Sequence, residues 1–258
     1  MEHGSGNSGR KPSGLTGRGI LIAAIFLLGL GIFLYPHICN WYYQYQFNKA
    51  IAAYDRFQGI DCEGMIQAAR EYNERLAKKE KQFLVPAEER EELDHLLDPW
   101  GTGMMGYVDI PKIGVHIPIY HGTEERALQS GAGFWYGTSL PVGGENTHCV
   151  LAAHNGLVKA KLFTDLDKLE VGDRFTLDVL NETFTYEVDQ ILVTLPEETE
   201  ELYIQNGKEL VTLYTCTPYG VNTHRLLVRG HRVTEPEKLW KKCAGSQKSE
   251  NGAFFDIN

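Results

Sequence analysis

Hydrophobic and polar positions divide the chain into three regions with different patterns. Ile20 to Tyr35, ILIAAIFLLGLGIFLY, is an apolar run of sixteen residues without a charge. Segments with helical spacing follow it. From residue 105 onward, short runs rich in β-branched and aromatic residues alternate with clusters of Gly, Pro and Asn. This order predicts a membrane helix, then a helical segment, then a β domain.

The second region predicts helices at three places. After the apolar run, Asn40 to Gln58 can continue as helix until Gly59. VPAEEREELDHLL predicts a short helix, with Pro86 near its start and acidic residues in its first turn, and DPWGTG ends it as a turn. Between these two, four apolar residues recur at the spacing of one helix face: Met65, Ala69, Tyr72 and Leu76.

The third region predicts at least seven strands with no long amphipathic helix among them. That pattern is typical of a barrel or a sandwich of about 130 residues. The runs are GYVDIPKI, VHIPIY, THCVLAA, RFTLDVL, TFTYEVDQILVTL, ELVTLYTC and HRLLVRGHRV.

Charge placement favours an uncleaved membrane anchor. Arg10, Lys11 and Arg18 all precede the apolar run, so the positive-inside rule places the N-terminus in the cytoplasm and the rest of the chain outside. A cleavable signal peptide would need small residues where YPHICN stands, and Cys39 lacks the small neighbours of a lipid-modified cysteine. A buried core helix is the remaining alternative for a run this short.

Net charge and cysteine content exclude two further classes of protein. The formal net charge of −9 disfavours a nucleic-acid partner, because such partners are bound largely through phosphates. The five cysteines are odd in number and contain no CxxC spacing, which argues against a disulfide framework.

Two residues at strand ends are candidates for catalysis. Cys216 ends LVTLYTC before the turn TPYG, and His154 ends CVLAAH before Asn-Gly, a strong turn signal. A buried structural cysteine and a surface histidine are the alternatives. His224 and Arg225 open the next strand, and adjacent strand residues point to opposite faces, so at most one of them can face Cys216.

Three more features carry weaker signals. Asp98 and Trp100 place an acid and a large aromatic in a Gly-flanked loop that could close over a site, although the Trp could instead pack into the core. His148, Cys149 and His154 spread too widely along one strand to converge on a metal. SLPVGG, residues 139–144, resembles a cell-wall sorting signal but lacks its Thr, and we interpret it as a turn.

The motifs in the third region resemble those of the sortases. LVTLYTCTPYGVNTHRLLVRGHRV contains Thr-Leu-x-Thr-Cys followed by an Arg nine residues on, and its extended form is similar to class C, the pilus-assembling sortases. The likeness continues through MGYVDIPKIGVHIPIYHGTEE, GTSLPVGGENTHCVLAAHNGL and AKLFTDLDKLEVGD, and covers roughly residues 84–233.

The resemblance implies a mainly β fold, a closed eight-stranded barrel with its site at the rim. It assigns Cys216 as nucleophile, His154 as general acid and base, and Arg225 as oxyanion stabiliser, with no cofactor or metal. Asp98 and Trp100 match a lid that lies over the Arg and Cys. The expected divisions are 1–18 cytoplasmic tail, 19–38 transmembrane anchor, 39–83 extracellular helical segment, 84–104 lid, 105–233 catalytic barrel and 234–258 polar tail.

The implied reaction is transpeptidation on the outer face of a Gram-positive cell membrane. Cys216 would cleave a Leu-Pro-x-Thr-Gly-like signal between Thr and Gly, and a pilin lysine or a cell-wall amine would accept the acyl group. Two departures weaken the pilin-polymerising role and keep wall anchoring open: class C enzymes usually carry a second, C-terminal span, and Ala-His-Asn-Gly replaces their common Gly-His-Arg-Gly. An L,D-transpeptidase and a non-catalytic wall-binding module are the two competing interpretations.

Overall fold

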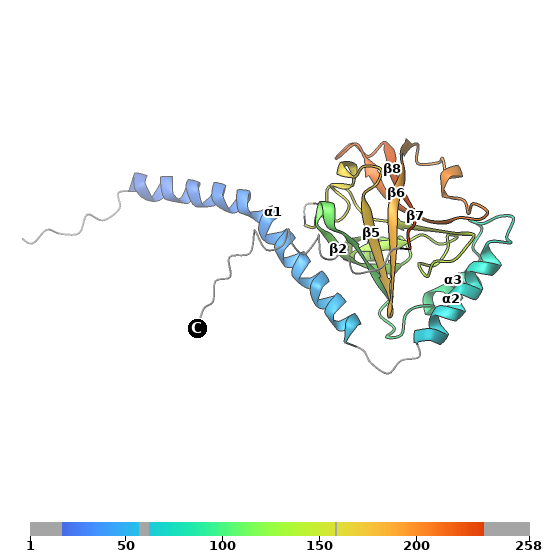
Figure 1. The fold of residues 1–258 in the computed structure, drawn as a ribbon. Coiled ribbons are helices and arrows are strands. Elements are labelled where there is room, and N and C mark those ends of the chain that lie inside the picture. The colour runs from blue at the N-terminus through green and yellow to red at the C-terminus, as the bar shows by residue number, and fades with distance from the viewer. Residues whose placement is uncertain (1–16, 57–61, 158, 235–258) are drawn as a thin grey trace, which may run out of the picture.

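Three helices precede a closed eight-stranded β-barrel in the computed structural model, which describes residues 17–56, 62–157 and 159–234 (Figure 1). Around the barrel the strand order is β1-β2-β3-β4-β7-β8-β6-β5. The strands are β1 Met104–Ile110, β2 Val115–His121, β3 Ala132–Phe134, β4 Thr147–Ala152, β5 Arg174–Val179, β6 Glu182–Thr194, β7 Glu209–Thr217 and β8 His224–Arg232. The helices are α1 Gly17–Asp55, α2 Cys62–Leu76, α3 Ala87–His95 and α4 Glu125–Ser130, with short 3-10 turns η1 Pro111–Ile113, η2 Leu166–Lys168 and η3 Glu200–Leu202. The expected closed barrel with N-terminal helices is confirmed.

The first helix, α1, joins two regions of different character. Its apolar first half is exposed, with Phe26 67% and Ile32 69% accessible, and it is long and apolar enough to cross a membrane. Its second half packs on the barrel and buries Phe47, Ile51 and Tyr54. Figure 1 shows the first half of α1 extending away from the barrel. The helix ends at Asp55 and Arg56 is in a turn, so it is shorter than the expected helix up to Gln58; Gly59 itself lies outside the described residues.

Polar contacts hold the second half of α1 in place at both ends. Near its C-terminal end, the Tyr54 hydroxyl donates to the carbonyl of Met105 (2.8 Å) and accepts from the backbone N–H of Leu180 (2.7 Å). Fourteen residues earlier, the Asn40 Oδ1 accepts from the N–H of Lys161 (3.0 Å). The helix therefore crosses the barrel wall from the loop after β4 to the start of β1.

The predicted helices α2 and α3 cover another side of the barrel. Ala69, Tyr72 and Leu76 of the predicted apolar face are buried, whereas Met65 is half-buried and its neighbour Ile66 takes the core position. Asn73 fastens α2 to the barrel, because its side-chain amide donates to the carbonyl of Leu140 (3.0 Å) and accepts from the N–H of the same residue (2.8 Å). As expected, α3 begins directly after a proline and carries two glutamates in its first turn.

The strand β7 lies between β4 and β8 and has a nearly continuous run of buried residues up to Thr215. It runs parallel to β4 and antiparallel to β8. Because both neighbours of β7 are core strands, the end of β7 is held on two sides. Its last residues, Cys216 and Thr217, are half-buried, where the strand leaves the core.

Two elements of the barrel region were not predicted from the sequence. β3 has only three residues, and α4 has six. Gly133 in β3 permits close backbone packing, because a Cβ there would come within 2.4 Å of the carbonyl oxygen of Gly122. Residues 139–144, SLPVGG, form a loop as expected, outside the strands. The expected tails at 1–18 and 234–258 lie almost wholly outside the described residues.

Candidate functional site

The strand register places Cys216 opposite Arg225. The two residues are direct partners in the antiparallel β7–β8 ladder, and Thr217 pairs with His224 in the next position. Directly opposite residues share a face of the sheet and successive residues alternate. The side chain of Arg225 therefore leaves the sheet on the same face as that of Cys216, while His224 leaves on the other face, where its Nδ1 lies 2.9 Å from the Thr223 hydroxyl.

His154 reaches the same place from the parallel neighbour β4. The β4–β7 pairing runs without a shift from Thr147 with Glu209 to Ala152 with Tyr214. Continuing the same offset by two residues puts His154 beside Cys216. Beyond the ladder, the N–H of Ala153 donates to the carbonyl of Tyr214 (3.1 Å), so the segment after β4 still runs beside β7 next to His154.

The imidazole of His154 has an uncommitted nitrogen. Its Nε2 is covered from solvent and has no hydrogen-bond partner among the described residues. The Glu125 Oε2 of α4 lies 3.9 Å from this nitrogen, and that glutamate side chain is 69% exposed. A nitrogen in this state is available to exchange a proton with a bound molecule.

Arg225 is held by backbone carbonyls. Its Nη1 donates to the carbonyls of Asn222 and His224, both at 2.9 Å. No carboxylate lies within 4.0 Å of it among residues 17–56, 62–157 and 159–234. Burial raises the pKa of the nearby Tyr214 hydroxyl, and the positive charge of Arg225 opposes that rise. The guanidinium is therefore ordered by its own turn, while its charge is free to act on an anion.

Asp98 and Trp100 lie in the loop between α3 and β1. The carboxylate of Asp98 accepts from the backbone N–H groups of Thr102 (3.0 Å) and Gly103 (2.7 Å), which closes its own turn. The ring of Trp100 packs edge-on against that of Tyr54, with centroids 4.7 Å apart. These contacts tie the two residues to their own loop and to α1. Their role as a lid over Cys216 and Arg225 stays a prediction.

His148 and Cys149 belong to the barrel wall. His148 is fully buried, with Nδ1 3.0 Å from the carbonyl of Tyr203 and Nε2 2.7 Å from the Thr212 hydroxyl. Cys149 is buried in the hydrophobic core, and burial raises the pKa of its thiol, which disfavours the reactive thiolate. Within the part of the chain that the structure describes, no group of three or more His, Cys, Asp or Glu side chains could hold a metal.

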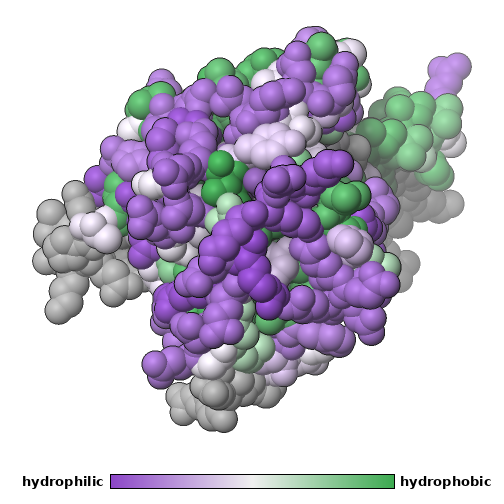
Figure 2. Space-filling view, turned by 90° about the vertical axis from the view of Figure 1, so that its right-hand side faces the viewer, coloured by the Kyte–Doolittle hydropathy of each residue, from purple (hydrophilic) through white to green (hydrophobic). Residues whose placement is uncertain are grey.

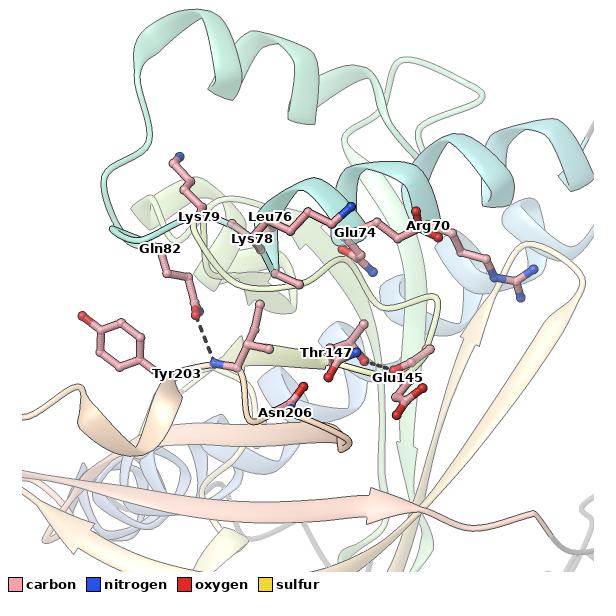
Figure 3. A pocket seen from close by; sticks show the side chains of 16 residues that line it. Arg70, Glu74, Leu76, Lys78, Lys79, Gln82, Glu145, Thr147, Tyr203 and Asn206 are labelled. Atoms are coloured by element: carbon pink, nitrogen blue, oxygen red, sulfur yellow. Dashed lines mark hydrogen bonds between the residues drawn. The ribbon is translucent and has the colours of Figure 1, made fainter.

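A separate pocket opens at the other end of β4. Its volume is about 720 Å³, and it lies between the end of α2, the loop before β4 and the segment that follows η3 (Figure 3). Gln82 crosses it, and its Oε1 accepts from the N–H of Ile204 (3.0 Å). Thr147, at the start of β4, lines it, whereas His154 follows the end of that strand. The pocket is therefore distinct from the Cys216 rim.

Among the described residues, the face that carries α2 and α3 is mainly hydrophilic. Figure 2 views the molecule from that side and shows the hydrophobic residues of the near face in small groups, with a larger hydrophobic group at the far upper right. Such scattered apolar residues are normal for a protein surface. Charged side chains such as Arg70, Glu74 and Lys78 also line the pocket next to α2.

Comparison with known proteins identifies the family. A family model described as "Sortase domain" matches residues 108–233. Sortase C1 from Streptococcus agalactiae is 46% identical to this chain, with a TM-score of 0.69, and the match covers 73% of this chain and all of that one. The chain belongs to the sortase family. Sortase C-1 from Actinomyces oris is a further structural neighbour, with 42% identity, a TM-score of 0.63 and coverage of 67% of this chain and 98% of that one.

Curated sortases match over a shorter region. Sortase D of Bacillus subtilis is 33% identical over 132 residues, which covers 50% of this chain and 64% of that protein. Sortase A of Bacillus anthracis is 29% identical over 130 residues, covering 50% and 60% respectively. This sortase thus spans less than two thirds of the length of these curated relatives, whereas it covers nearly all of the two class C structures.

One residue of the site was missed by sequence reasoning. The side-chain amide of Asn155 donates to the carbonyl of Cys216 (2.8 Å), so it links the turn after His154 to the end of β7. In the sequence, Asn155 indicates only the first half of an Asn-Gly turn. The parallel pairing of β4 with β7 would have been needed to recognise its partner.

Proposed function

We propose that this sortase is a cysteine transpeptidase whose site is formed by Cys216, His154 and Arg225. The observation that supports this most directly is the meeting of three strand ends, with Cys216 opposite Arg225 on β8 and beside His154 after β4. The proposed substrate is a protein with a Leu-Pro-x-Thr-Gly-like sorting signal, cleaved between Thr and Gly.

In the first half-reaction, the Cys216 thiolate attacks the Thr carbonyl carbon and a carbon–sulfur bond forms. Arg225 donates to the oxyanion, and a donor of this kind is worth roughly 3–4 kcal/mol in the transition state. As the tetrahedral intermediate collapses, the Thr–Gly carbon–nitrogen bond breaks. The His154 imidazolium gives its proton to the departing glycine amine. The products are an acyl-enzyme thioester and a free C-terminal peptide.

In the second half-reaction, an amine attacks the thioester carbon. Neutral His154 takes the proton of the incoming amine, a new amide bond forms, and Cys216 leaves as thiolate. We propose a pilin lysine as the acceptor, since the structural neighbours are class C sortases. The alternative acceptor is a cell-wall amine. In either case α1 is proposed as a single membrane anchor, with the barrel on the outer face of a Gram-positive cell.

The site assignment predicts a specific pattern of inactive variants. Cys216→Ala, His154→Ala and Arg225→Lys should each lower peptide cleavage at least about 100-fold, because each removes a group used in the transition state and Lys cannot reproduce the guanidinium fork. The measurement is cleavage of a fluorogenic sorting-signal peptide by the full-length chain in detergent micelles.

His224→Ala is the matched control for His154→Ala. It removes the histidine adjacent to Arg225, on the opposite face of β8, and should retain most of the activity. Loss of activity in His224→Ala together with an active His154→Ala would overturn the assignment. With whole pilins, a covalent ladder supports the lysine acceptor, whereas a single product with a wall-like amine supports anchoring.

A further inference from the structure

The side chain of Asn155 joins the two strand ends that carry the proposed catalytic pair. Its Nδ2 donates to the carbonyl oxygen of Cys216 at 2.8 Å, while its backbone directly follows His154. We infer that Asn155 is a positioning residue that fixes His154 relative to Cys216. The inference rests on the proposed function, since it assigns no chemistry of its own to Asn155.

The bond lies where the regular ladder between β4 and β7 stops. The N–H of Ala153 donates to the carbonyl of Tyr214, and the Thr215 hydroxyl donates to the carbonyl of Ala153 (2.7 Å). Past this point the chain turns away at Gly156, whose φ is 82°. The side-chain amide of Asn155 thus adds one further hydrogen bond between the segment after β4 and the end of β7, and this bond reaches Cys216 itself.

The turn after His154 is held firmly on its other side. The carbonyl of His154 accepts from the N–H of Phe163 (3.2 Å), and the N–H of Gly156 donates to the Thr164 hydroxyl (3.1 Å). A Cβ at position 156 would also come within 2.8 Å of the Tyr219 ring in the β7–β8 loop. Because the turn is already hydrogen-bonded to residues 163–164, the bond from Asn155 holds the backbone of Cys216 in a fixed position relative to that turn.

The required chemistry is that of a hydrogen-bond donor. A carbonyl oxygen only accepts, so Asp at position 155 would keep the shape of the side chain and lose the bond. The Oδ1 of Asn155 is buried and has no partner among the described residues, so the side-chain amide bonds there only through its donor end. A displacement of about 1 Å between reacting groups can cost on the order of 100-fold in rate.

The test compares Asn155→Leu and Asn155→Asp, which lack the donor, with Asn155→Gln, which keeps it on a longer arm. In the full-length chain, we expect the first two to lower kcat about 10- to 100-fold while KM changes less than about threefold. Asn155→Gln should recover part of the loss. Asn73→Asp is the matched control, because it removes a comparable amide bond to the carbonyl of Leu140 (3.0 Å) far from the site. It should lower the melting temperature and leave kcat of the folded protein unchanged.

A second readout does not depend on substrate turnover. The rate of Cys216 alkylation by iodoacetamide is measured against pH by peptide mass mapping, and the Leu and Asp variants should show an altered pH profile. Unchanged kcat and an unchanged alkylation profile would overturn the positioning role while leaving the proposed function intact. If the wild-type chain cleaves no sorting peptide and Cys216→Ala alters nothing, the proposed function fails. The alkylation profile then still decides whether Asn155 acts on Cys216.

Discussion

At the scale of single residues, His148 is a titratable group enclosed in the barrel wall. Its Nδ1 faces a carbonyl, which only accepts, so that nitrogen carries the proton and Nε2 accepts from Thr212. Burial lowers the pKa of His148 to about 4, an effect reinforced by the charge of Arg229 and opposed by the Tyr203 carbonyl and Asp189. The folded protein therefore keeps this imidazole neutral through mildly acidic pH.

This arrangement predicts a loss of stability in mild acid. In the unfolded chain His148 binds a proton below its ordinary pKa of about 6.5, whereas in the folded chain it does so only near 4. The contribution is thus fully present above pH 6.5 and is lost as pH falls toward 4, by up to about 3 kcal/mol. Thermal unfolding between pH 7.5 and 4.5 measures the slope.

His148→Gln is the control, because an amide can donate and accept but does not titrate in this range. Its free energy of unfolding should depend less steeply on pH than that of the wild type. Part of the slope should remain, since burial also lowers the pKa of His121. If the free energy of unfolding falls equally steeply with pH in the two proteins, His148 is not the source of the acid sensitivity.

Local patterns alone made Cys216 and His154 candidates for the site, because each ends an apolar strand before a turn, and strand alternation separated Arg225 from His224. Their catalytic roles came from the resemblance to the sortases and stay a proposal. The bond from Asn155 to Cys216 was not predictable, because it joins residues 61 positions apart. It depends on the parallel pairing of two strands, which no local spacing reveals.

At the scale of elements, the segment 84–104 has its aromatic side chain against α1 rather than free in solvent. The Trp100 ring meets Tyr54, and that tyrosine is itself fixed by two backbone hydrogen bonds. The local sequence favoured packing of Trp100 into the core, whereas the resemblance to class C sortases favoured a lid. The contact with Tyr54 could not be inferred from the sequence, since it depends on where α1 docks.

The lid hypothesis predicts faster cleavage of short peptides after truncation of the covering side chain. If the segment covers the site, Trp100→Ala removes the ring that lies over Cys216 and with it a barrier to peptide entry. We expect kcat/KM for a sorting-signal peptide to rise a few-fold. Trp41→Ala is the matched control, because Trp41 is 70% exposed on α1. Unchanged or slower cleavage by Trp100→Ala would argue against a gating lid.

Element type was more predictable than element number in this fold. Seven strands and the helices before them carry clear periodic patterns, and each is present in the structure. The eighth strand, β3, is only Ala132–Phe134. A segment of three residues with a central glycine is too short to show an alternation of apolar and polar residues. β3 is a strand because it pairs with its neighbours β2 and β4.

At the scale of the whole molecule, the docked half of α1 belongs to the barrel as much as to the anchor. This half buries three large side chains against the barrel, those of Phe47, Ile51 and Tyr54. A chain beginning at residue 39 should therefore unfold at the same temperature as the full chain. A chain beginning at residue 62 should lose roughly 5 kcal/mol, given about 1.5–3 kcal/mol for each large apolar side chain. Chemical denaturation of the two fragments measures the difference, and equal stabilities would show that α1 is only a tether.

The continuity of α1 also sets where this enzyme can work. Asn40, the first docking contact, lies only five positions after Tyr35, the end of the apolar run, and at 1.5 Å per residue this is about 8 Å. With α1 in a bilayer, the barrel lies close to the membrane surface, because a continuous helix rather than a flexible linker connects the two. Substrates retained in the same membrane then meet it by a two-dimensional search within a thin layer, at a high effective concentration. Under this proposal, proteins released from that layer escape the enzyme by geometry alone, before any recognition at the Cys216 site.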